Sequence, residues 1–227
     1  MINTIAILGK IPLFKGLKAT ELQKINKIAR IKEFTKNQII FSENSLGTSL
    51  FIILTGKVKI FAEHKGKKKI FTYIAPGEFF GELALIDDPI RTASAQALSD
   101  TEVLTINRDE FKKILTKHPD MTYNLMKILA KRLRFADKEI ESLSFCNVFT
   151  RVVKSLIALS KKYGKTVPEG KLIDIKLDNE ELAELTGTVR EVIIRVLKQL
   201  DNLCCVKHAP GRKILLTNEN KLITLIN

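Results

Sequence analysis

The sequence predicts an α+β protein in which a sheet-rich N-terminal region is followed by a long helix and a compact C-terminal module. Short runs rich in Ile, Val, Phe and Thr, separated by glycines, occupy about residues 34–106. Apolar residues then recur at alternating steps of three and four, as in a heptad seam. Near the C-terminus, two helix-start motifs follow each other closely, which is typical of two short helices joined by a tight turn.

Composition and length indicate a folded chain. The protein has 227 residues, of which 45% are hydrophobic and 28% charged, and this excludes a disordered or collagen-like chain. The longest apolar run is the short segment Leu50–Leu54, so we expect no membrane association. Three cysteines without CxxC spacing exclude a disulfide scaffold and disfavour a metal site. With no signal-peptide pattern at the N-terminus, we expect a cytoplasmic protein.

The N-terminal region is expected to begin with helices and continue as a sandwich or roll. The first thirty residues show helical spacing of their apolar positions. Short strands follow to about Ile106, and Lys65–Lys69 has the composition of a hairpin tip. Several short strands at this spacing favour a closed antiparallel sandwich or roll.

Helical periodicity returns after Asn107. Residues 108–117 are predicted to form a short helix, and Pro119 begins a longer one. Its seam consists of Met126, Leu129, Leu133, Ala136, Ile140 and Leu143. The seam either lies on the helix's own domain or forms a parallel dimer interface in which Ala136 lets two backbones approach closely.

The C-terminal module is predicted to start with an amphipathic helix over 148–162, a loop over 163–170 and a strand over 172–177. Asp178-Asn-Glu-Glu181 and Thr188-Val-Arg-Glu191 are two capping boxes, and Gly187 separates the helices that they start. Such a pair is typical of a helix-turn-helix, although other helical hairpins share the spacing. Pro210–Lys213, between two strand-like segments, resembles a basic β-wing.

The second of these helices carries side chains that are suited to reading DNA. Arg190 and Glu191 lie in its first turn and Arg195 one turn later; arginine pairs with guanine and glutamate accepts from cytosine. Alternatively, Glu191 only caps the helix and pairs with Arg195. The net charge of +13 is compatible with nucleic acid but is spread along the chain, so charge alone does not decide.

A possible anion site lies in the sheet-rich region. The turn at Gly81-Glu-Leu83 exposes backbone amides at the start of a helical turn. Glu82 can accept from a sugar hydroxyl, and Arg91 and Thr92 can hold a phosphate. The alternative is an internal Glu82–Arg91 ion pair that serves stability alone.

Two segments together resemble a known family. The stretch Phe80–Ser94 is similar to the phosphate-binding cassette of cyclic-nucleotide-binding domains, and Leu185–Arg195 is similar to a recognition helix of the CRP/FNR family of bacterial transcription regulators. The likeness covers nearly the whole chain in the same order. It implies a cyclic-nucleotide-binding β-roll of the double-stranded jelly-roll type over 1–118, a dimerisation helix over 119–146 and a winged helix-turn-helix over 147–227.

The resemblance also implies site residues and partners. The effector-binding residues would be Gly81, Glu82, Leu83, Ala84, Arg91, Thr92, Ala136 and Asp137. The DNA-binding residues would be Thr188, Arg190, Glu191, Ile194, Arg195, Lys198, Arg212 and Lys213. The family implies a homodimer on a palindromic double-stranded DNA operator, RNA polymerase as a further partner, no required cofactor, and cyclic AMP or cyclic GMP as an allosteric ligand. No catalytic step is implied, and no nucleophile–base set or metal cluster predicts one.

The chain departs from the family's pattern at several positions. Ala136 and Asp137 replace a Thr-Ser pair that contacts adenine in the family's best-known member, which leaves the preferred base open. Cys204 replaces the usual glycine after the recognition helix, and the adjacent Cys204 and Cys205 are interpreted as packing residues. The alternatives are a regulator of the same fold with a vestigial or non-nucleotide pocket, and a cyclic-nucleotide-responsive signalling subunit.

Overall fold

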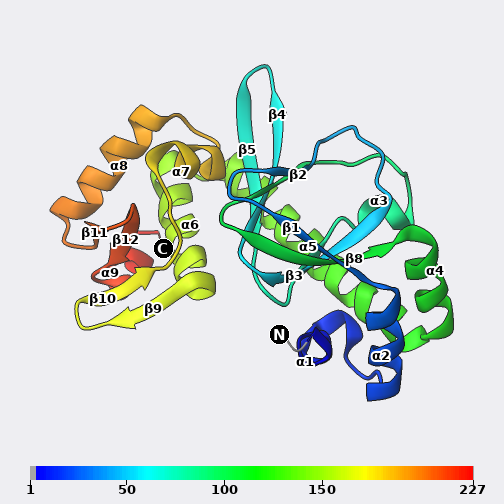
Figure 1. The fold of residues 1–227 in the computed structure, drawn as a ribbon. Coiled ribbons are helices and arrows are strands. Elements are labelled where there is room, and N and C mark those ends of the chain that lie inside the picture. Colours follow the sequence, from blue (N-terminus) through cyan, green and yellow to red (C-terminus); the bar gives the residue numbers. More distant parts are fainter. Residues whose placement is uncertain (1–3, 227) are drawn as a thin grey trace. The chain divides into compact units, whose positions relative to one another are not determined.

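The computed structural model describes residues 4–226 and divides them into two compact units. The first unit runs to His64 and continues from Ile70 to Phe135. The second consists of Lys65–Lys69 and the chain from Ala136 onward. Figure 1 labels most elements of both units, which are described separately below. Among the described residues, no helix combines the length and apolar character that crossing a bilayer requires.

Two four-stranded sheets form the β-roll of the first unit and confirm the strands expected between residues 34 and 106. The sheet orders are β1-β8-β3-β6 and β2-β7-β4-β5. The strands are β1 (Arg30–Phe34), β2 (Ile39–Phe41), β3 (Ser49–Thr55), β4 (Val58–His64), β5 (Lys67–Ile74), β6 (Phe79–Phe80), β7 (Ser94–Ala97) and β8 (Thr101–Asn107). Strand β8 pairs antiparallel with β1 and β3, with Thr105 opposite both Arg30 and Phe51.

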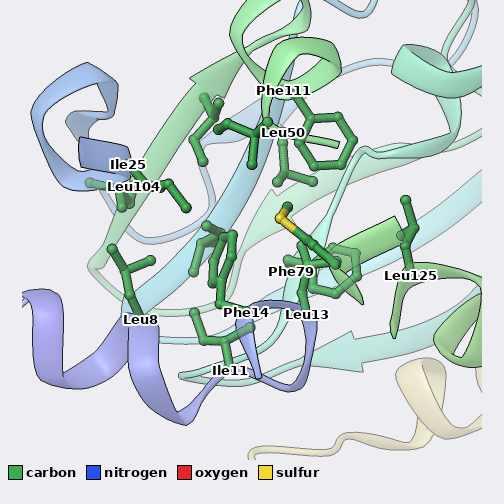
Figure 2. Close-up of a cluster of buried hydrophobic side chains, with 14 of the residues drawn as sticks. Leu8, Ile11, Leu13, Phe14, Ile25, Leu50, Phe79, Leu104, Phe111 and Leu125 are labelled. Carbon is green, nitrogen blue, oxygen red and sulfur yellow. The ribbon is translucent and has the colours of Figure 1, made fainter. Parts of the chain in front are cut away.

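The five central residues of strand β3, Leu50–Leu54, are all apolar because both faces of the strand are buried there. Side chains alternate between the faces of a strand. Leu50, Ile52 and Leu54 join one hydrophobic cluster, whereas Phe51 and Ile53 join another with residues of the second sheet. The first cluster also holds helical residues, and Figure 2 shows Leu8, Phe14 and Phe111 among its members. The uninterrupted run Leu50–Leu54 therefore marks a strand packed on two sides.

Helices on one side of β3 complete this core. They are α1 (Thr4–Lys10), the 3-10 helix η1 (Pro12–Phe14), α2 (Ala19–Ile28), α4 (Arg108–Lys117) and the start of α5 (Pro119–Phe145). The Asn107 side chain accepts from the Glu110 amide and caps α4, which confirms the helix expected over 108–117. Met121 and Leu125 of α5 are buried in the core, but Leu133 is 64% exposed and Ile140 63%. Of the expected seam, Leu129 packs against this core, whereas Met126 is 54% exposed and belongs to the exposed apolar stripe.

The second unit is a small α+β module with a four-stranded sheet in the order β11-β12-β10-β9. Its elements are α6 (Val148–Tyr163), β9 (Gly164–Val167), β10 (Gly170–Ile173), α7 (Asn179–Thr186), α8 (Arg190–Asn202), β11 (Val206–Ala209), β12 (Lys213–Leu216) and α9 (Glu219–Thr224). The prediction of a loop over 163–170 was wrong, because Gly164–Val167 pairs with Gly170–Ile173 as a hairpin. Gly170 permits this packing: a Cβ there would lie 2.1 Å from the Leu216 carbonyl oxygen.

Candidate effector site and DNA-binding surface

The segment that the sequence predicts to be the cassette starts at the end of β6 with a turn at Gly81. Gly81 has φ of +83°, and helix α3 (Leu83–Ile86) follows one residue later. A Cβ at Gly81 would lie 2.6 Å from the Arg91 Nη1 atom, so glycine is needed both for the turn and for the space. Backbone hydrogen bonds hold Arg91 in place: its amide donates to the Ser45 carbonyl at 2.8 Å, and its carbonyl accepts from Asn44 at 2.9 Å.

Arg91 lies inside the unit with only 4% of its surface exposed. Its Nη1 donates to the Gly81 carbonyl at 2.7 Å and its Nη2 to the Ser49 carbonyl at 2.8 Å. The guanidinium also stacks over the Phe41 ring, 4.1 Å from the centroid. Burial lowers the pKa of Arg91, and Glu82 opposes this shift. Arg91 therefore adds a desolvated positive charge to the cassette.

Glu82 is even more buried, with 1% of its surface exposed, and its partner comes from α5. Arg132 Nη1 lies 2.5 Å from Glu82 Oε1, and Arg132 Nη2 donates to the Phe79 carbonyl at 2.8 Å. The internal ion pair considered from the sequence thus forms with Arg132 instead of Arg91. Among residues 4–226, Glu82 Oε2 and Arg91 Nε are buried without a hydrogen-bond partner. Buried polar atoms of this kind are the groups that a polar ligand satisfies.

The remaining predicted effector residues are distributed unevenly. Ala84 is buried and Leu83 is exposed on α3, while Thr92 next to Arg91 is also exposed. Arg108 donates to the Ala84 and Gly47 carbonyls and so ties the cassette to the start of α4. Ala136 and Asp137 are exposed on α5 and belong to the second unit. The first unit therefore brings together Gly81, Glu82, Ala84 and Arg91.

In the second unit, only one of the two predicted capping boxes forms, the one at the start of α7. The Asp178–Glu181 box is confirmed, with the Asp178 side chain accepting from the Glu181 amide at 2.8 Å. The box at Thr188 was wrong, because α8 begins at Arg190 and its N-cap is Val189 without a side-chain bond. The Thr188 amide instead donates to the Ala183 carbonyl and helps to end α7. Gly187, at φ of +66°, makes this left-handed ending possible.

Helix α8 separates its side chains into a buried face and an exposed face. The buried face consists of Ile193, Val196, Leu197 and Leu200. The exposed face carries the DNA-binding candidates that the sequence placed on this helix, which are Arg190, Glu191, Ile194, Arg195 and Lys198. Within residues 4–226 no ion pair joins Glu191 to Arg195, so both charged groups remain available to a ligand. The face has the residue types that contact base edges and phosphates in a major groove.

The two basic residues of the predicted wing, Arg212 and Lys213, have different surroundings. Arg212 is exposed, adopts a left-handed φ of +58°, and lies 3.8 Å from Asp178 at its nearest pair of charged atoms. Lys213 is held by Asp174 at 2.5 Å, and Lys165 lies 2.6 Å from the same carboxylate. These two hydrogen-bonded lysines lower the pKa of Asp174 to about 2. Lys213 is therefore already engaged by Asp174, which follows β10, whereas the Arg212 side chain is largely exposed to solvent.

Sequence reasoning missed two arginines that the structure makes prominent. Arg132 holds Glu82, and Arg151 on α6 bonds three backbone carbonyls. No local motif marks either arginine, because Arg132 pairs with a residue fifty positions away and Arg151 bonds only backbone carbonyls. The one signal in the sequence was that each is an arginine on an amphipathic helix with no assigned partner.

Comparisons with known proteins agree on both units. Residues 31–118 match the model of the cyclic nucleotide-binding domain, and residues 150–225 match the model of the Crp-like helix-turn-helix domain. The chain is 35% identical over 201 residues to the cyclic AMP receptor protein of Thermus thermophilus, which covers 88% of this chain and 90% of that protein.

Solved structures of the same fold extend the comparison. The catabolite activator protein of T. thermophilus has a TM-score of 0.55 at 33% identity and covers 95% of this chain and 98% of its own. A regulator from Xanthomonas campestris, described as responsive to cyclic di-GMP, has a TM-score of 0.78 at 24% identity. It covers 88% of this chain and 100% of its own, and at that identity it supports the fold alone.

Proposed function

The chain belongs to the CRP/FNR family of transcription regulators, and we propose that it is a homodimer that binds a palindromic operator under the control of a cyclic nucleotide in the β-roll. The observation that carries the effector part is the pair of buried charges at the cassette. Arg91 and Glu82 lie almost entirely out of solvent, and each retains a polar atom without a partner among the described residues. A phosphate and a ribose hydroxyl supply the matching acceptor and donor.

The exposed face of α8 supports the DNA-binding part. Arg190, Glu191 and Arg195 project from one side of a helix whose other side is buried in the unit. In a two-fold dimer, two such helices enter successive major grooves about one DNA turn apart. Lys198 and Arg212 extend the same charge toward the phosphate backbone, and RNA polymerase is the proposed downstream partner.

The exposed stripe of α5 supports the homodimer. Met126, Leu133, Ile140 and Leu143 are all exposed in the isolated chain, although they follow the heptad spacing. A second copy of the helix would bury them against their own equivalents and would present two recognition helices in two-fold symmetry.

Direct titration tests the proposed effector. Calorimetry with cyclic AMP and with cyclic GMP should give saturable heat on the wild-type protein. Arg91→Ala should lose that heat, and Arg91→Lys, which keeps the charge but not the two-pronged guanidinium, should weaken it. Ligand at about 100 times its dissociation constant should also raise the free energy of unfolding by roughly 2.7 kcal/mol. Wild-type protein that binds neither nucleotide would contradict the effector proposal and leave DNA binding untouched.

A second candidate is a regulator of the same fold with another ligand. Two backbone carbonyls already accept from the Arg91 guanidinium, and Asp137 stands where a hydroxyl-bearing pair contacts adenine in the family's best-known member. Cyclic di-GMP is the natural third titrant, given the description of the Xanthomonas regulator. Binding of cyclic di-GMP without cyclic AMP or cyclic GMP would favour this candidate.

A further inference from the structure

Arg151 connects two elements of the second unit through a single side chain. Its Nη1 donates to the Cys146 carbonyl at 3.1 Å. Its Nε donates to the Thr186 carbonyl at 3.0 Å, and its Nη2 to the Gly187 carbonyl at 3.2 Å. All three nitrogens of the guanidinium thus donate to backbone oxygens. Two of these oxygens, those of Thr186 and Gly187, belong to the turn that precedes α8.

The three acceptors lie at helix ends. Cys146 directly follows α5, Thr186 is the last residue of α7, and Gly187 is its left-handed cap. Carbonyls at helix C-termini lack partners within the helix and carry partial negative charge, so a cation is favoured there. Only two residues separate Gly187 from Arg190, where α8 begins. The direction in which α8 leaves the turn therefore depends on where this turn is held.

The backbone of Arg151 is held in the capped first turn of α6. It lies in the first turns of α6, whose N-cap Asn147 accepts from the Thr150 amide at 2.9 Å, and the Arg151 amide donates to the Asn147 carbonyl at 3.1 Å. A planar guanidinium on a capped helix can hold several acceptors in one geometry, which the single ammonium of lysine cannot do.

A second contact joins the same two elements. A Cβ at Gly187 would lie 3.3 Å from Leu143 Cδ2, which places the Leu143 side chain directly against the turn. Leu143 also belongs to the exposed apolar stripe of α5. The end of the proposed dimer seam and the turn before the recognition helix are thus linked by packing as well as by the Arg151 hydrogen bonds.

We propose that Arg151 is a positioning residue that fixes the direction of α8 relative to the C-terminal end of α5, and thereby sets the distance between DNA half-sites that the dimer accepts. This inference rests on the proposed dimeric function. A cation that only stabilised the end of α7 would change the melting temperature and would leave the preferred half-site distance unchanged.

The test uses a palindromic operator selected by the full-length protein from a random duplex library. Affinities are measured on that operator and on versions with one base pair added to or removed from its centre, together with the melting temperature. Wild-type protein should prefer one spacing by about tenfold or more, because the recognition helices of a rigid dimer are spaced one DNA turn apart. Arg151→Met should reduce this preference to within about threefold while retaining affinity for a single half-site.

Two further variants make the result interpretable. Lys154→Met changes a lysine on the same helix, whose Nζ lies 3.2 Å from the Cys146 Sγ, and should keep the wild-type preference. Arg151→Lys keeps the charge at the helix end but not the three-way fork, so it should also lose spacing preference. If Arg151→Met does not fold, Arg151→Lys carries the comparison.

The outcomes separate the two levels of the proposal. Wild-type spacing preference in Arg151→Lys or Arg151→Met, or an equal loss of affinity on every spacing with a lower melting temperature, would overturn the positioning role alone. Wild-type protein without any spacing preference would overturn the dimeric function and this inference with it. Relaxed spacing in the Arg151 variants but not in Lys154→Met is the result that we expect.

Discussion

Glu82 and Arg132 form a 2.5 Å ion pair that joins the cassette of the first unit to α5 across fifty residues of sequence. Arg132 also bonds the Phe79 carbonyl, so the long helix holds both the strand that leads into the cassette and its buried carboxylate. The carboxylate that we propose as the partner of a ribose hydroxyl is thereby positioned by the helix that carries the proposed dimer seam. This geometry links the proposed effector site to the proposed dimer interface within one unit.

Arg132→Met should destabilise the protein, because it leaves the Glu82 carboxylate buried without its cation. Since the Arg132 side chain is itself part-exposed, we expect a loss of about 2 kcal/mol, which is below the roughly 3–5 kcal/mol for breaking a fully buried pair. Urea unfolding measures the change, with Arg134→Met on the exposed side of the same helix as the control. Adding Glu82→Gln should recover part of the loss, and a purely additive double variant would argue against the pairing.

Arg190→Ala should weaken operator binding by about 1–3 kcal/mol and relax one base position. The reason is that the exposed Arg190 guanidinium, in the first turn of α8, is suited to bidentate contact with guanine. Lys198→Ala should instead weaken binding equally on all sequences and lower the salt slope by about one. Binding selections on randomised half-sites distinguish the two; a uniform loss in Arg190→Ala would make Arg190 a phosphate contact.

Leu133→Lys should dissociate the proposed dimer. Leu133 is one of the most exposed apolar residues of the α5 stripe, and a lysine there would place like charges face to face in a two-fold seam. Sedimentation equilibrium should show a dimer dissociation constant raised by about 100-fold or more. Lys138→Glu, on the same helix but outside the stripe, should remain dimeric. A wild-type protein that sediments as a monomer at all concentrations would refute the seam.

Asp174 should contribute stability that disappears in acid. Because Lys165 and Lys213 depress its folded-state pKa to about 2, the folded protein binds fewer protons than the unfolded chain between pH 4 and pH 2. The contribution is therefore complete at neutral pH and is lost as pH falls through that range. Asp174→Asn should melt below wild type at pH 7, and the gap should narrow toward pH 3. A gap that stays constant would exclude the charge as its cause.

Local patterns predicted much of the architecture correctly. The strand-rich region, the helix over 108–117, the heptad-bearing α5 and the Asp178 capping box follow from residue periodicity and capping chemistry, which act over a few residues. The pattern failed at Thr188, where the amide is used to end α7 and the start of α8 moves to Arg190. It also failed at Gly164–Val167, which became a strand only because β10 pairs with it.

The sequence by itself determined which side chains are available: the cassette residues, the exposed face of α8 and the apolar stripe of α5. The tertiary structure alone decided their partners. In the folded chain, Glu82 pairs with Arg132 instead of Arg91, and Lys213 pairs with Asp174. The Arg151 side chain donates to backbone carbonyls at the ends of two other helices. Periodicity reports which face of an element is buried, whereas a long-range ion pair or backbone contact depends on how distant segments pack, and no local pattern encodes that.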